Sequence, residues 1–182
     1  MPVRSAQLRM ARAALNWTVR DLAEATGLHR NTITNIEVGR YAGDQKSLEL
    51  IEQVLRKAGI EFIDEGGPGV RLRKRQQIIV GDPAPSVPAS NLTHMEEISG
   101  AQIRAARALL RWSAIDLAQA SALGVNTIRR AEIADEGTAL TAANELAIRR
   151  ALEVAGVVLI DENGGGPGVR LRERLKGKSR GR

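Results

Sequence analysis

Residues 21–37 read Asp-Leu-Ala-Glu-Ala-Thr-Gly-Leu-His-Arg-Asn-Thr-Ile-Thr-Asn-Ile-Glu, and this stretch decides the fold. It predicts two short helices joined by a tight turn. In the second helix, Ile33 and Ile36 have the three-residue spacing of one buried face. Gly27 lies where the chain has to turn sharply, a place that often needs a positive φ. The stretch therefore predicts a helix-turn-helix.

The second of these helices has a polar outward face. Because residues four apart on a helix project from the same side, four polar side chains share this face. They are Arg30, Asn31, Thr34 and Asn35. Guanidinium and amide groups on a short exposed helix can reach base edges in the DNA major groove. A plain helical bundle is the alternative interpretation, since such bundles also contain helix pairs with a glycine turn.

The same stretch occurs a second time, at residues 116–132, with a constant offset of 95. Core positions and polar positions are both repeated, which indicates a tandem duplication. The identical pairs include Asp21/Asp116, Leu22/Leu117, Ala23/Ala118, Leu28/Leu123, Asn31/Asn126, Thr32/Thr127, Ile33/Ile128 and Glu37/Glu132.

Composition limits the classes of function. The 182 residues include no Cys and only two His, His29 and His94, which argues against a thiolate or zinc site. No apolar run approaches the roughly 20 residues of a membrane span, and no secretory signal is seen. We therefore expect a soluble, cytoplasmic protein without metal or cofactor. No nucleophile–base set is evident, so an enzyme is not predicted.

Charge is unevenly distributed along the chain. Residues 1–75 carry 13 Lys+Arg and 9 Asp+Glu, whereas residues 96–176 carry 11 of each. Three more cations lie in the tail at residues 177–182. A basic balance favours an anionic partner. The first repeat is thus better suited to phosphates than the second, and the tail is either a basic arm along DNA or a disordered end.

Each repeat places an arginine on the core-facing side of its first helix. These are Arg12 and Arg107. A charge at such a position needs an acidic partner. Glu37 and Glu132 follow the buried face of the outward-reading helices, so we expect ion pairs Arg12–Glu37 and Arg107–Glu132.

Helix boundaries follow from capping residues. The first helix is expected at residues 5–17 with Ser5 as its N-cap. Thr18 and Ser113 are expected N-caps of the next helices, because an aspartate follows each three residues later. Further helices are predicted at about residues 47–58 and 142–155, each stopped by a glycine.

Each repeat ends in a β-hairpin pattern. Residues 60–64 and 70–73 alternate around a Gly-Gly-Pro-Gly turn, and residues 157–161 and 169–172 repeat this. A lone hairpin is marginal in water. The hairpins must therefore pack on their helices, on each other, or on another subunit, and the last case would give a homodimer. The predicted domains are residues 1–75 and 98–176, with a Pro-rich linker at 76–97.

These residues resemble the Cro/C1-type (XRE) helix-turn-helix family. The resemblance is carried by Leu8-Arg9-x-x-Arg12, Asp21-Leu-Ala, Gly27-Leu28, Thr32-Ile33 and Ile36-Glu37-Val-Gly39. It implies a mainly α fold class with two lambda-repressor-like helix-turn-helix domains, each followed by a C-terminal β-hairpin. The hairpin resembles an extension seen in a bacterial subgroup of single-domain XRE regulators.

The resemblance also implies the residues that contact DNA. In the first repeat these are Arg30, Asn31, Thr34 and Asn35, with His29 near phosphate and Arg40 as a further contact. In the second they are Asn126, Arg129 and Arg130, with Val125 in the place of Arg30.

Two departures from the family pattern stand out. The family's usual Gln near the start of the second helix is replaced by Val19 and Ala114, so its phosphate contact is absent or replaced. Ala122 replaces the turn glycine of the second repeat, and Gly124 appears two residues later. This second departure predicts a distorted second turn.

Two functional hypotheses follow. The first is a sequence-specific transcriptional regulator that binds double-stranded DNA and reads two unequal half-sites through tandem recognition helices, in the bacterial nucleoid. The alternative is a protein-interaction regulator, antitoxin-like or an antiactivator, in which only the first domain binds DNA. Contacts with RNA polymerase or another regulator are further candidate partners.

Overall fold

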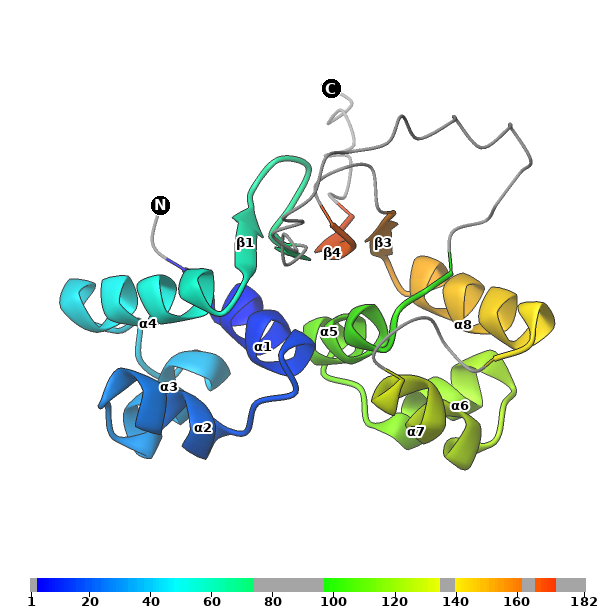
Figure 1. Cartoon of the computed structure of the whole chain (residues 1–182), viewed down its shortest axis with the longest axis horizontal. Helices are drawn as coiled ribbons and strands as arrows, with labels where there is room; N and C mark the ends of the chain where they lie inside the picture. The colour runs from blue at the N-terminus through cyan, green and yellow to red at the C-terminus, as the bar shows by residue number, and fades with distance from the viewer. Residues whose placement is uncertain (1–2, 74–96, 135–139, 162–165, 173–182) are drawn as a thin grey trace, which may run out of the picture.

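The computed structural model describes residues 3–73, 97–134, 140–161 and 166–172. Four helices followed by two strands occur in the same order twice (Figure 1). We call residues 3–73 the first unit and the described part of residues 97–172 the second unit. The first unit contains α1 (Ser5–Ala14), α2 (Val19–Thr26), α3 (Arg30–Val38), α4 (Gln45–Lys57), β1 (Ile60–Ile63) and β2 (Gly69–Leu72). The second contains α5 (Gly100–Leu110), α6 (Ala114–Ser121), α7 (Val125–Ile133), α8 (Ala142–Val154), β3 (Val157–Ile160) and β4 (Gly168–Leu171).

The predicted caps of α2 and α6 are confirmed. Thr18 precedes α2, its hydroxyl accepts a hydrogen bond from the backbone of Asp21, and the Asp21 carboxylate accepts one in return. Ser113 and Asp116 form the same capping box before α6. Each box satisfies two backbone N–H groups that a helix start leaves without partners.

The first helix begins at the predicted residue, but its predicted N-cap and its predicted end were wrong. Ser5 is the first residue of α1, and Arg4 is its N-cap. The backbone N–H of Arg4 instead donates to the Gln7 side chain at 3.1 Å. The helix ends at Ala14 rather than near residue 17, because Asn16 takes the left-handed conformation at φ 56°. An asparagine tolerates that conformation better than most residues.

The two hairpins pair with each other into one four-stranded antiparallel sheet of order β1-β2-β4-β3. The junction is centred on Val70 opposite Val169, with Gly69 opposite Arg170 and Arg71 opposite Gly168. The register is symmetric, since Gly69 and Gly168 each face an arginine of the other hairpin. The sequence left open whether the hairpins pack on their helices, on each other or on another subunit. In the structure they pair with each other within one chain.

Two buried glutamines hold the sheet on the helices below it. The Gln7 side chain donates to the backbone carbonyls of Ile63 (3.0 Å) and Gly69 (3.4 Å). Gln102 donates in the same way to Ile160 (3.0 Å) and Gly168 (3.2 Å). Both side chains thus bridge the two strands of their own hairpin.

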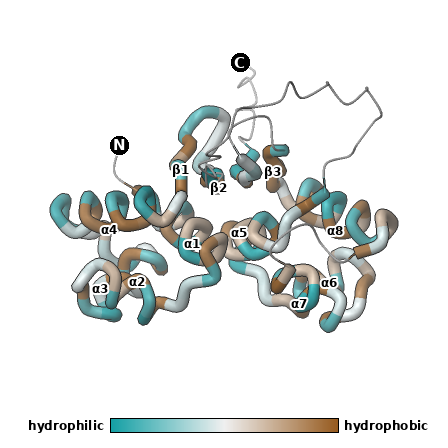
Figure 2. Tube along the Cα trace, in the orientation of Figure 1, coloured by the Kyte–Doolittle hydropathy of each residue, from teal (hydrophilic) through white to brown (hydrophobic). Residues whose placement is uncertain are grey.

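The two units share one hydrophobic core. Helix α1 packs against α5 in the centre of the molecule, and the buried apolar side chains of both units form a single cluster. Met10 of α1 and Ala105 of α5 are both buried in it. The edge strands β1 and β3 are largely brown, or hydrophobic, in Figure 2, and Ile60 and Val157 at their starts are buried in the same cluster. The units are therefore held together by the sheet and by the α1–α5 contact.

The layers place the helix-turn-helix pairs on one side. The sheet lies above α1 and α5, and α2, α3, α6 and α7 lie on the opposite side (Figure 1). In the part of the chain that the structure describes, none of the helices combines the length and the apolar character needed to cross a membrane.

Candidate nucleic-acid interface

Helix α3 is fixed at both ends and from beneath. His29 is its N-cap, and the His29 Nδ1 accepts a hydrogen bond from the backbone N–H of Asn31 at 3.2 Å. Gly39 ends the helix in the left-handed conformation at φ 78°. Ile33 and Ile36 are buried in the core. The inward face is thus apolar, and the opposite face is available to a partner.

The structure places most of the predicted contacts of the first unit in solvent. His29, Arg30, Asn31, Thr34 and Arg40 are all exposed. Asn35 is half-buried instead, and its backbone carbonyl accepts hydrogen bonds from the N–H groups of the next turn. The exposed set therefore offers one guanidinium, one amide and one hydroxyl on a single helix, with Arg40 just beyond its end.

Helix α7 presents a different set. Asn126, Arg129 and Arg130 are exposed, whereas Val125 is half-buried and packs against the hydrophobic core. The expectation that Val125 stands in place of Arg30 as a reading residue is not supported by this position. Two arginines and one amide remain on the outward face of α7.

The turn between α6 and α7 is not distorted, contrary to the sequence-based expectation. Ala122 takes the left-handed conformation at φ 55°, as Gly27 does at φ 71° in the first unit. The residues before α3 and α7, His29 and Gly124, have nearly the same angles (φ −69°, ψ 140° and φ −69°, ψ 141°). An alanine thus adopts the conformation that glycine favours, at a cost of about 1–2 kcal/mol.

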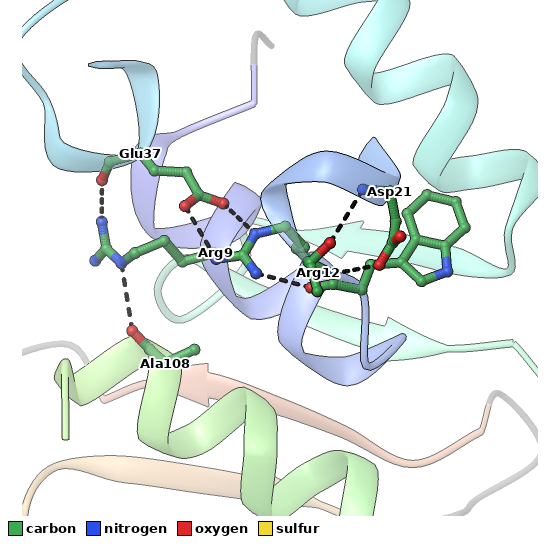
Figure 3. Close-up of polar contacts among 7 residues, drawn as sticks. Arg9, Arg12, Asp21, Glu37 and Ala108 are labelled. Atoms are coloured by element: carbon green, nitrogen blue, oxygen red, sulfur yellow. Dashed lines mark hydrogen bonds and ion pairs between the residues drawn. The ribbon is translucent and has the colours of Figure 1, made fainter. Parts of the chain in front are cut away.

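The Arg12–Glu37 pair connects α1 to α3 (Figure 3). Arg12 Nε lies 2.7 Å from Glu37 Oε1, and Arg12 Nη2 lies 3.1 Å from Glu37 Oε2. The side chain of Glu37 is 7% exposed and that of Arg12 22%. Arg12 also donates to the backbone carbonyl of Trp17 at 2.7 Å. One guanidinium therefore ties together α1, the connection to α2, and the end of α3.

The second unit forms the equivalent pair. Arg107 Nη2 lies 3.0 Å from Glu132 Oε2, and Arg107 donates to the Trp112 carbonyl at 2.8 Å. The structure thus brings together both predicted pairs, and in both units the pair sits behind the outward-facing helix. A two-point guanidinium–carboxylate contact of this kind restricts orientation as well as distance.

Two further arginines, which the sequence-based reasoning missed, cross between the units. Arg9 donates to the backbone carbonyls of Glu37 in its own unit and of Ala108 in the other, the latter at 3.3 Å (Figure 3). Arg104 donates to the Glu132 carbonyl and, at 2.9 Å, to that of Ala13. Each arginine lies at the same offset of 95 from its counterpart, and this repetition was the signal that could have identified them.

These reciprocal bonds define a pseudo-twofold axis between α1 and α5. The bond from Arg9 to the Ala108 carbonyl is matched by one from Arg104 to the Ala13 carbonyl, as in a symmetric dimer. Burial lowers the pKa of Arg9, the nearby Arg111 guanidinium lowers it further, and Glu37 opposes both effects. Two guanidinium groups, those of Arg9 and Arg111, therefore act on each other near this axis.

The two units differ where their outward helices end. Gly39 closes α3 in the left-handed conformation, but its counterpart Ala134 is extended, with φ −64° and ψ 118°. Ile133 at the end of α7 is 76% exposed. Val19 and Ala114, which replace the family's Gln, are half-buried against the core. Residues 76–96 of the predicted linker (76–97) and the basic tail at 177–182 lie outside the described residues.

Comparison with known proteins identifies one part of the chain. Residues 8–62 match the family model described as Helix-turn-helix, so the chain carries one helix-turn-helix domain of the Cro/C1 (XRE) type there. Domains of this type are those of DNA-binding regulators. The match begins in α1 and ends within β1, and the second unit lies outside it. Neither a search of curated proteins nor one of solved structures found a match.

Proposed function

We propose that this chain is a sequence-specific DNA-binding transcriptional regulator, in which both units act as helix-turn-helix domains and read two unequal half-sites. The observation that carries the proposal is the shared placement of α3 and α7. Both lie on the side opposite the sheet, and both expose polar faces around one pseudo-twofold axis. A symmetric dimer presents its two recognition helices to one face of DNA in this way.

Because the exposed faces of α3 and α7 differ, we expect the two half-sites of the operator to differ in sequence. The first unit offers Arg30, Asn31 and Thr34, and the second offers Asn126, Arg129 and Arg130. Arginine pairs with guanine and asparagine with adenine through two hydrogen bonds each. The second half-site is therefore expected to contain more guanine contacts than the first, at a spacing of about one helical turn.

The test uses the intact chain, because the shared sheet and core make separated units a poor substitute. Duplexes are selected from a random-sequence pool, and Asn31→Ala and Asn126→Ala are each compared with the exposed amide control Gln53→Ala on α4. Each reading variant should lose about tenfold or more in affinity and relax base preference in one half-site only. Unchanged preference in both variants would refute base reading by these amides.

A second candidate is favoured by one observation on the second unit. Ile133 and Ile115 are 76% and 52% exposed, on α7 and α6. Helices α6 and α7 are in contact, and apolar surface gathered on neighbouring elements is typical of protein interaction sites. In this case α7 binds a protein partner, and only α3 reads DNA. Arg129→Ala plus Arg130→Ala would then leave the DNA sequence preference unchanged, whereas the first proposal requires one half-site to be lost.

A further inference from the structure

A cavity of about 420 Å³ lies on the pseudo-twofold axis between the two units. It is lined from both sides by the ends of α1 and α5 and by the connections that follow them. Figure 1 shows these connections running from the centre of the molecule to α2 and α6, away from the sheet. Its volume falls within the range of about 300–1,000 Å³ typical of small-ligand sites.

The lining is cationic. Five arginines contribute to it, and no carboxylate does: Arg9, Arg12, Arg104, Arg107 and Arg111. Four of the five are held by protein acceptors, namely the two ion pairs and the carbonyls described above. The carbonyl acceptors are neutral, so Arg9 and Arg104 keep their charge, whereas the Glu37 and Glu132 carboxylates offset the charges of Arg12 and Arg107.

Arg111 is the exception among these side chains. It is exposed at the rim and forms no ion pair or hydrogen bond through its side chain with the other described residues. Its guanidinium is close enough to Arg9 to disfavour the charge of that partly buried group. Two like charges are thus held near each other, and an anion between them would relieve the repulsion.

The backbone of Arg111 is also strained. It takes the left-handed conformation at φ 59°, which arginine rarely adopts. Its counterpart in the first unit, at the same offset of 95, is Asn16 at φ 56°, a residue that tolerates this conformation. Strained backbone is found preferentially at functional sites, and here it places a cationic side chain at the cavity.

We propose that this cavity binds a phosphate group through Arg111 and Arg9, carried either by a free phosphorylated ligand or by the backbone of bound DNA. Guanidinium groups match phosphate oxygens in geometry and charge. The site is not part of the outward faces of α3 and α7, and the inference does not require that those helices read bases.

The first arm of the test measures pyrophosphate binding to the full chain without DNA, by calorimetry at constant ionic strength. Arg111→Asn removes the guanidinium and installs the residue that occupies the equivalent place in the first unit, so folding is preserved. It should weaken binding about tenfold or more. Arg150→Gln, at an exposed position on α8, is the control for net charge and should leave binding unchanged. Asn16→Arg should tighten it.

The second arm uses a duplex selected by the full chain and maps phosphate contacts by ethylation interference. A contact midway between the half-sites that is lost in Arg111→Asn identifies backbone phosphate as the source. Pyrophosphate binding that is the same in Arg111→Asn and wild type overturns the proposal. So does the absence of both pyrophosphate binding and a central contact. If no duplex is selected, the proposed function fails, and pyrophosphate binding alone decides the cavity.

Discussion

Gly69 and Gly168 make the junction between the two hairpins possible. A Cβ on Gly69 would lie 2.5 Å from the Cβ of Arg170, and one on Gly168 would lie 2.7 Å from the carbonyl oxygen of Val70. Both distances are shorter than any ordinary contact, and the second involves backbone that cannot move aside. The two units can therefore share one sheet only if these positions have no side chain.

Gly69→Ala and Gly168→Ala should each destabilise the protein by about 1–3 kcal/mol, because the added methyl group has to force β2 and β4 apart. Urea unfolding of the full chain measures the change. Gly124→Ala is the control, since its nearest contact would be Thr127 Oγ1 at 3.7 Å and its φ of −69° suits alanine. Equal effects at Gly168 and Gly124 would contradict the proposed tightness of the junction.

Arg12→Met should cost about 2–3 kcal/mol, because Glu37 is left buried without its cation. A fully buried pair costs about 3–5 kcal/mol when one partner is removed, and the partial exposure of Arg12 reduces that figure. Adding Glu37→Leu should restore most of the loss. Arg20→Ala is the comparison: its pair with Glu24 is exposed and screened by solvent, so it should leave the free energy of unfolding nearly unchanged. Similar losses for both single variants would show that the buried pair has no special role.

Ala122→Gly should stabilise the protein by about 0.5–1 kcal/mol, because glycine removes the left-handed strain and loses only part of that gain to chain entropy. Gly27→Ala is the reciprocal change and should destabilise by a similar amount. No atom would lie within 4 Å of the new Cβ at Gly27, so its effect reports backbone strain alone. Thermal unfolding of the two variants checks the signs, which must be opposite.

Acid should weaken the helix caps. The pKa of Asp21 lies below its ordinary value because the backbone N–H and then the hydroxyl of Thr18 hydrogen-bond its carboxylate. Ser113 lowers the pKa of Asp116 in the same way. As pH falls, these two carboxylates therefore take up protons at a higher pH in the unfolded chain than in the folded protein. The stabilisation is present above the unfolded pKa of about 3.9 and is lost as pH falls through the folded value.

The measurement for this prediction is the melting temperature between about pH 6 and about pH 3. The double variant Asp21→Asn, Asp116→Asn should lose less stability over this interval than the wild type, because neither side chain can take up a proton. A parallel decline in both proteins would show that other carboxylates control acid unfolding. Asp44, whose pKa is lowered by the hydroxyl and then the backbone N–H of Ser47, remains in both proteins.

Local features of the fold were predictable from the sequence because they depend on neighbouring residues. The capping residues Thr18 and Ser113 act within one helical turn, and the spacing of Ile33 and Ile36 defines a buried face without further information. The N-cap of α1 was not predictable in this way. Gln7 is recruited to bonds with β1 and β2, more than 50 residues away, and this long-range contact favours Arg4 over Ser5 as the N-cap.

The sequence predicted which side chains the candidate site contains, but it did not predict how the two units are placed relative to each other. The outward positions on α3 follow from the helical period, and the residues Arg12 and Glu37 require each other electrostatically. Val125 is half-buried against the core, unlike the exposed Arg30, because a small apolar residue at the start of α7 can pack beneath the helix. The roles of Arg9 and Arg104 depend on the approach of α1 to α5, and no pattern within either repeat specifies that approach.

The pairing of β2 with β4 joins both units within one molecule, and this has a consequence for dose response. A homodimeric regulator must associate before it binds, so its occupancy falls steeply on dilution. A single chain with a built-in partner has no association step, and its occupancy follows the first power of its concentration. Under the proposed function, each outward helix can also acquire substitutions by itself, so the two halves of the operator would be free to diverge independently.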